Sequence, residues 1–159
     1  MSVSGRWWIV RRYLVVANQT LGGEELWGAI RERIAGGDCH FHLLVPATPA
    51  DQLDPGVTAE VAAEGGPGED LGRRLARQRM RHELDRMREL GASVSGEIGV
   101  ADPVDAVRVV LHRWEFDEVI VSTLPGRRSR WLAADLPTKI RRGFKLQVTQ
   151  VTGATAARG

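Results

Sequence analysis

The chain has 159 residues, of which 43% are hydrophobic and 26% are charged. These fractions are typical of soluble globular proteins and exclude disordered and collagen-like classes, and a chain of this length can bury about 70% of its unfolded surface. Apolar runs such as residues 13–17 are far shorter than the about 20 residues of a membrane-spanning helix. We expect one domain over residues 1–159 without a membrane segment, with residues 1–10 and 153–159 as flexible tails.

The formal net charge is only +2 at pH 7, but the arginines are concentrated in a few segments, and basic patches favour anionic partners such as phosphate or nucleic acid. The single cysteine, Cys39, can form neither an intrachain disulfide nor a CxxC redox or zinc site. Arg11 and Arg12 interrupt the N-terminal apolar stretch before it reaches the length of a signal peptide. These features favour a cytoplasmic protein.

The first half of the chain alternates strand and helix patterns. Residues 11–18 contain the continuous apolar run of a strand that is buried on both faces. Residues 24–35 have the apolar period of a helix, and two glycines follow it. Residues 39–45 alternate as a second strand, which Pro46 ends. The sequence from 47 to 69 is rich in proline and glycine and is predicted to be a long loop.

The longest helix is predicted over residues 70–90. Its apolar stripe consists of Leu71, Leu75, Met80, Leu84 and Met87. Seven arginines cover much of the remaining surface, and such a set could follow a phosphate backbone. Because Glu83, Asp85 and Glu89 interleave with them, the pattern favours pairing within the helix and makes nucleic-acid binding an unfavoured alternative.

Three further elements complete the predicted domain. Residues 93–98 form a third strand, and residues 102–114 form a helix that Asp102 caps. The expected buried face of this helix is Val104, Val107, Leu111 and Trp114. Residues 117–122 and 146–151 are predicted as the fourth and fifth strands. Strands alternating with helices at this spacing require right-handed crossovers, so the sequence predicts a doubly wound, Rossmann-like α/β fold with a five-stranded parallel sheet.

The passage from the third strand into the third helix carries a recognisable motif. It reads Gly99-Val100-Ala101-Asp102-Pro103 and leads into Ala106 and Val107. With five strand–helix units, a long second loop and a basic segment after the fourth strand, it resembles the universal stress protein family, its actinobacterial members in particular, over nearly the whole chain. The resemblance implies the sheet order 3-2-1-4-5, a ligand site where the first and fourth strands end, and ATP or AMP as the ligand.

Polar and small residues at these strand ends are the candidate contacts of an adenine nucleotide or another anion. The predicted binding residues are Ala17, Asn18, Gln19, Val45, Thr123, Gly126, Arg127, Arg128 and Arg130. Asn18 offers an amide to a ribose or base edge, and the three arginines offer guanidinium groups that suit phosphate oxygens. Alternatively, these arginines form a solvated loop.

The phosphate-binding pattern of the family is altered in this chain. Members that bind ATP carry Gly-x-x-Gly, nine residues, and then Gly followed by Ser or Thr. The equivalent span here starts at Thr123, keeps Gly126, and reaches Leu136 and Pro137. Asp135 is expected to cap the next helix and to place a carboxylate where phosphate would bind. A nucleotide-free, dimeric interaction module with a closed pocket therefore stays as the alternative function.

Other side chains are weighed as catalytic, metal or dimer sites. His40 and His42 share a strand face, but the sequence shows no third metal ligand, so we expect a structural role. Cys39, Ser122 and Thr123 have no identifiable base, so no catalytic residue is assigned. Residues 146–152 alternate like an edge strand, which favours a homodimer through this strand, as in the family.

Overall fold

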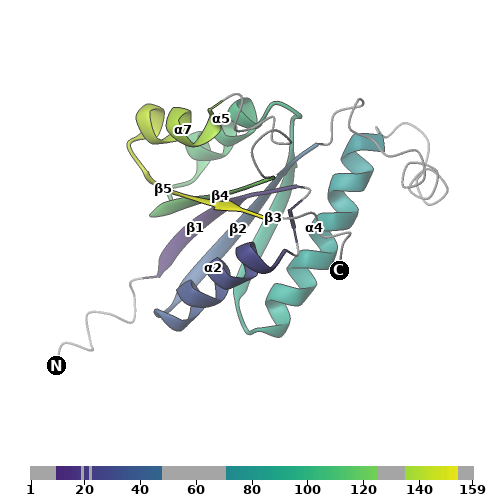
Figure 1. Ribbon diagram of the computed structural model, residues 1–159, viewed down its shortest axis with the longest axis vertical. Helices are drawn as coiled ribbons and strands as arrows, with labels where there is room; N and C mark the ends of the chain where they lie inside the picture. Colours follow the sequence, from purple (N-terminus) through teal and green to yellow (C-terminus); the bar gives the residue numbers. More distant parts are fainter. Residues whose placement is uncertain (1–9, 19, 22, 48–70, 125–134, 154–159) are drawn as a thin grey trace.

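The computed structural model describes residues 10–18, 20–21, 23–47, 71–124 and 135–153. Its elements in chain order are β1 (Arg11–Val16), α2 (Glu24–Ala35), β2 (Cys39–Pro46), α4 (Leu71–Glu89), β3 (Ser93–Gly99), α5 (Pro103–Arg113), β4 (Glu118–Thr123), α7 (Leu136–Phe144) and β5 (Gln147–Thr152). The strands form one parallel sheet in the order β3-β2-β1-β4-β5 (Figure 1). The predicted fold class and strand order are confirmed.

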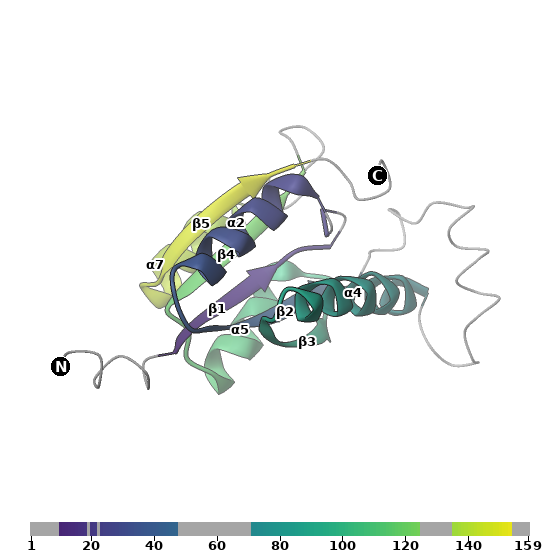
Figure 2. The same ribbon diagram turned by 90° about the horizontal axis from the view of Figure 1, so that it is seen from below.

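Helices cover both faces of the sheet, with α2 and α4 on one face and α5 and α7 on the other (Figure 2). Alternate residues of β1 serve the two layers, because successive side chains of a strand point to opposite faces. Tyr13 and Val15 pack in the cluster under α2 and α4, whereas Leu14 and Val16 pack in the cluster under α5 and α7. The central strand is therefore buried on both sides, as its apolar run predicts.

The long helix α4 differs from its predicted stripe at one polar position. Leu75, Leu84 and Met87 are buried as predicted, and Glu83 is buried with them at 2% exposure. The predicted pairing within the helix is present, because Arg86 and Arg88 lie 3.7 and 3.4 Å from Glu83 and Asp85. No helix in the described part of the chain is long and apolar enough to span a membrane.

The prediction that Trp114 lies on the buried face of α5 is wrong, since this side chain is 47% exposed. Trp114 is the C-cap, and its extended backbone, with φ −133° and ψ 151°, no longer follows the helical period. The predicted Val107 is buried together with Ala106 and Val110, and the predicted Val104 and Leu111 are partly buried against the same cluster. At the other end of α5, the Asp102 carboxylate accepts backbone hydrogen bonds from the first turn, as predicted.

The glycine and the alanine of the motif are in direct contact. A Cβ atom added to Gly99 would lie 2.7 Å from the Cβ of Ala106 and 3.0 Å from Leu44 Cδ1. Real Cβ atoms do not approach other atoms this closely, so β3 and α5 can pack at this separation only with small residues at both positions. The motif is therefore a packing requirement in this chain.

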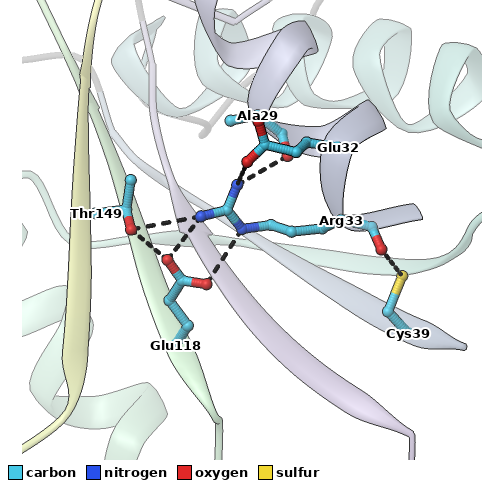
Figure 3. A network of polar contacts seen from close by, with 6 residues as sticks. All are labelled: Ala29, Glu32, Arg33, Cys39, Glu118 and Thr149. Atoms are coloured by element: carbon cyan, nitrogen blue, oxygen red, sulfur yellow. Dashed lines mark hydrogen bonds and ion pairs between the residues drawn. The ribbon is translucent and has the colours of Figure 1, made fainter. Parts of the chain in front are cut away.

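A buried ion pair ties α2 to the two strands at one edge of the sheet (Figure 3). Arg33 Nε and Nη2 donate to the two carboxylate oxygens of Glu118 at 3.1 and 2.7 Å, and the Thr149 hydroxyl donates to the same carboxylate. Burial raises the pKa of Glu118, but the hydrogen bonds and the charge of Arg33 outweigh it and hold the pKa below its usual value. Arg33 and Glu118 are therefore both charged, and with Thr149 they link α2, β4 and β5.

Candidate functional site

The predicted binding residues that the structure describes gather where the strand order reverses, at the carboxyl ends of β1, β2 and β4. Ala17 and Asn18 follow β1, Val45 lies near the end of β2, and Thr123 ends β4. All four are buried, with exposed fractions of 0%, 7%, 0% and 2%. This is the edge at which open α/β sheets bind ligands. The other predicted binding residues, Gln19, Gly126, Arg127, Arg128 and Arg130, lie outside the described residues.

Asn18 connects the end of β1 to a neighbouring strand and to a helix. Its amide nitrogen donates to the Pro46 carbonyl at 2.7 Å, and its amide oxygen accepts from Arg79 Nη1 of α4 at 2.5 Å. These two bonds fix which side of the amide faces each partner. Asn18 thereby holds one arm of the Arg79 guanidinium at the carboxyl edge of the sheet.

Arg79 is the polar residue at this edge that the sequence pattern does not single out. Its side chain is partly buried, and burial lowers its pKa. No carboxylate in the described part of the chain forms an ion pair with it, in contrast to Arg33. A signal is nevertheless present in the sequence, because Arg79 lies four residues after Leu75 and four before Glu83, on the buried side of α4.

Two hydroxyls bridge the two sides of the switch point. Thr20, in the loop after β1, and Ser122, in β4, place their oxygens 2.5 Å apart, and both residues are 2% exposed. Thr123 is tied to the end of β5, because its carbonyl accepts from the Gly153 N–H at 3.0 Å. The floor between β1 and β4 is therefore polar at this end of the two strands.

The prediction that the Asp135 side chain caps α7 is wrong. Asp135 is exposed, has φ 55° and ψ 44°, and makes no side-chain hydrogen bond to the first turn of α7. A capping side chain needs an extended backbone, and this residue is in the left-handed region instead. Leu136 and Pro137 follow it and are buried. The Asp135 carboxylate is thus not bonded to the amides at the start of α7.

The comparisons with known proteins agree on the fold. No protein-family model and no curated protein sequence matches the chain. A universal stress protein family protein from Arabidopsis thaliana with AMP bound superposes with a TM-score of 0.59 at 12% identity, over 90% of this chain and 92% of that chain. A universal stress protein in complex with cAMP gives 0.56 at 18% identity, over 91% and 98% of the two chains.

A third structure, the universal stress protein from Archaeoglobus fulgidus, gives a TM-score of 0.54 at 13% identity, over 94% of this chain and 98% of that chain. At such identities a structural likeness carries the fold and not the activity. The three matches span nearly the full length of both partners and share the α/β architecture. The chain therefore has the fold of the universal stress proteins.

Proposed function

We propose that the chain is a regulatory domain of the universal stress protein type, with a divergent phosphate motif, that binds an adenine nucleotide or a related anion where β1 and β4 end. The observation that carries the proposal is Arg79, a partly buried guanidinium held by Asn18 at this edge, with no ion pair to a described carboxylate. The proposed contacts are Arg79 together with Ala17, Asn18, Gln19, Val45, Thr123, Gly126, Arg127, Arg128 and Arg130.

A cation that is removed from water without a counterion is costly, and proteins usually pair such groups. An anionic ligand would supply a counter-charge that no described carboxylate provides, and the guanidinium fork suits phosphate oxygens because it can donate two parallel hydrogen bonds. Asn18 accepts from one arm of Arg79, and the proposal assigns the other nitrogens of the guanidinium to the ligand. That two proteins of the same fold are crystallised with AMP and cAMP supports a nucleotide as this anion.

The test is a thermal-unfolding series of the whole chain with AMP, ADP, ATP and inorganic phosphate, with and without magnesium. A ligand at 100 times its Kd stabilises the folded state by about 2.7 kcal/mol, which is a measurable rise in Tm. We expect this rise in the wild type and its loss in Arg79→Met. Arg88→Met is the matched control on α4, because Arg88 is exposed and paired with Asp85.

Each result separates a part of the proposal. A rise with phosphate and with every nucleotide identifies a general anion site, and a rise with nucleotides alone identifies recognition of the nucleoside. A further loss in Arg127→Ala with ATP, but not with AMP, would assign Arg127 to the outer phosphates. No rise at millimolar concentrations of any of these ligands would contradict the proposal.

The edge position of β5 favours a second candidate function, a nucleotide-free module that acts as a homodimer. In the described sheet β5 pairs only with β4, so its other side is open to a strand of a second copy. Leu136 and Pro137 are buried at the start of α7, as a closed pocket would require. Sedimentation without nucleotide is the test: this function requires a dimer that Gln147→Lys with Gln150→Lys weakens, and a wild-type monomer would contradict it.

A further inference from the structure

A continuous hydrogen-bond network of polar side chains crosses β2 and β3, away from the carboxyl edge described above. His40 Nδ1 lies 2.7 Å from Ser93 Oγ, and His40 Nε2 lies 2.9 Å from Ser95 Oγ. His42 Nδ1 lies 2.7 Å from the same Ser95 Oγ, and His42 Nε2 lies 2.7 Å from Glu97 Oε2. The strand register brings these residues together, because His40 and His42 are paired with Ser93 and Ser95.

The Glu97 carboxylate lies at one end of this network of side chains, and its ionised state sets the direction of the neighbouring hydrogen bonds. Burial raises the pKa of Glu97, but the hydrogen bonds from His42 and Arg113 and the charge of Arg113 outweigh it and lower the pKa, so this carboxylate only accepts at neutral pH. In the neutral form that a general base requires, His42 donates from Nε2 to Glu97 and accepts at Nδ1, which directs the Ser95 hydroxyl proton to His42. Because the Ser95 proton points to His42, Ser95 Oγ accepts from His40, and His40 donates from Nε2.

Ser95, His42 and Glu97 therefore stand in the order of a nucleophile, its base and the carboxylate that orients the base. Arg113 holds the carboxylate, with Nη2 at 2.6 and 2.7 Å from its two oxygens. Phe116 packs near the His42 ring, with centroids 6.1 Å apart. Hydrogen bonds at both ring nitrogens thus orient the His42 imidazole, and Ser95 is partly exposed.

We propose that Ser95 is a nucleophile for acyl transfer from small carboxylic esters, with His42 as its general base and Glu97 as the positioning residue. Neither the fold nor the proposed nucleotide site requires this arrangement. It lies on β2 and the edge strand β3, on the face covered by α5 and α7. The outer side of β3 pairs with no strand in the described sheet, and the proposal assigns its outward backbone N–H groups to the developing oxyanion.

The reaction balances without a metal or a cofactor. Ser95 Oγ forms a bond to the acyl carbon while its proton passes to His42 Nδ1, and Glu97 stabilises the resulting imidazolium. The ester C–O bond breaks, and the leaving alcohol takes the proton from His42. A water molecule then gives a proton to His42, attacks the acyl-serine and releases the carboxylic acid, and the proton returns to Ser95.

The experiment labels the whole chain with a fluorophosphonate probe, maps the modified peptide, and measures p-nitrophenyl acetate hydrolysis on the same samples. We expect modification at Ser95 that Ser95→Ala abolishes. His42→Ala should slow labelling on the order of 100-fold or more, the usual contribution of a general base. Ser93→Ala is the matched control: Ser93 lies on the same strand face and hydrogen-bonds to His40, not to His42 or Glu97 among the described residues, so labelling should persist.

The role of Glu97 needs a readout beyond the rate. Glu97→Asp keeps a carboxylate and should retain part of the activity, whereas Glu97→Gln, whose neutral amide stabilises an imidazolium poorly, should lose it. Because Glu97 does not touch the substrate, the loss of p-nitrophenyl acetate hydrolysis in Glu97→Gln should fall on kcat and leave KM unchanged. A kcat in Glu97→Gln equal to that of the wild type would remove Glu97 from the proposal.

Circular dichroism and thermal unfolding confirm that each variant is folded before it is compared. Absence of labelling and of hydrolysis in the folded wild type would overturn the proposal, and so would labelling that persists in Ser95→Ala. Loss of labelling in the folded Ser93→Ala control to the level of Ser95→Ala would also overturn the assignment of Ser95.

Discussion

The charged side chains of this protein differ in how much their ion pairs contribute to the free energy of unfolding. The side chains of Arg33 and Glu118 are 14% and 4% exposed, whereas those of Arg108 and Asp105 are 54% and 56% exposed, although their atoms lie 2.7 and 2.8 Å apart. Breaking a buried pair by removing one partner costs about 3–5 kcal/mol, and an exposed pair contributes about 0–1 kcal/mol. We expect Arg33→Met to lose about 3 kcal/mol of unfolding free energy and Arg108→Met less than about 1 kcal/mol, measured by urea denaturation at pH 7.

The loss in Arg33→Met should depend on pH with a definite sign. The pKa of Glu118 is lowered in the folded protein, so its contribution is present above the unfolded pKa of about 4.3 and is lost as pH falls through the folded value. The stability difference between wild type and Arg33→Met should therefore be large at pH 7 and shrink below about pH 4. A difference that is constant from pH 7 to pH 3 would show that the charge of Glu118 is not involved.

Glu83 is predicted to behave in the opposite way. Its side chain is buried, Oε2 has no hydrogen-bond partner among the described residues, and burial raises its pKa against the weaker effect of Arg86. The folded chain binds this proton more tightly than the unfolded chain, so wild-type stability falls as pH rises above about 4.3. Glu83→Met should stabilise the protein by about 1 kcal/mol at pH 7, and the gain should disappear in acid. Glu89→Met, an exposed position on α4, is the control and should change little.

At the scale of elements, the contact between β3 and α5 makes the clearest prediction. Gly99→Ala would press a methyl group against Ala106 and Leu44, and such overpacking costs about 1–3 kcal/mol. Gly28→Ala is the matched control, because nothing lies within 4 Å of a Cβ atom at this exposed position of α2. It should stabilise the helix by up to about 1 kcal/mol. Equal effects of the two substitutions in thermal unfolding would contradict this account of the motif.

Most elements could be predicted from the sequence because the local pattern and the packing agree. The apolar period of the first strand and the cap at Asp102 are examples, since each depends on residues that are close in the chain. The side-chain positions of Asp135 and Trp114 were harder to predict. Both residues lie at helix ends, where the backbone angles decide the direction of the side chain, and the sequence does not show these angles. Local patterns predict which residues begin and end a helix more reliably than they predict where the side chains of those residues point.

At the scale of the whole molecule, the sheet order came from the family resemblance and the sites came from contacts between distant segments. Asn18 could be predicted as part of the carboxyl edge because it follows a buried strand. Its contact with Arg79 joins residues 61 positions apart, and the bond between His42 and Ser95 joins residues 53 positions apart. Helix placement and strand register decide such contacts, and neither follows from a single sequence.

The central claim, that Arg79 and Asn18 form an anion site at the carboxyl edge of the sheet, is tested most directly by calorimetric titration of the wild type and Arg79→Met with AMP. The account predicts saturable binding with one site per chain in the wild type and no detectable binding in Arg79→Met. Because Arg79 is a desolvated cation without a described carboxylate, this variant should be as stable as the wild type without ligand, or more stable. Equal AMP affinity in the two proteins, or no binding to either at millimolar AMP, would contradict it.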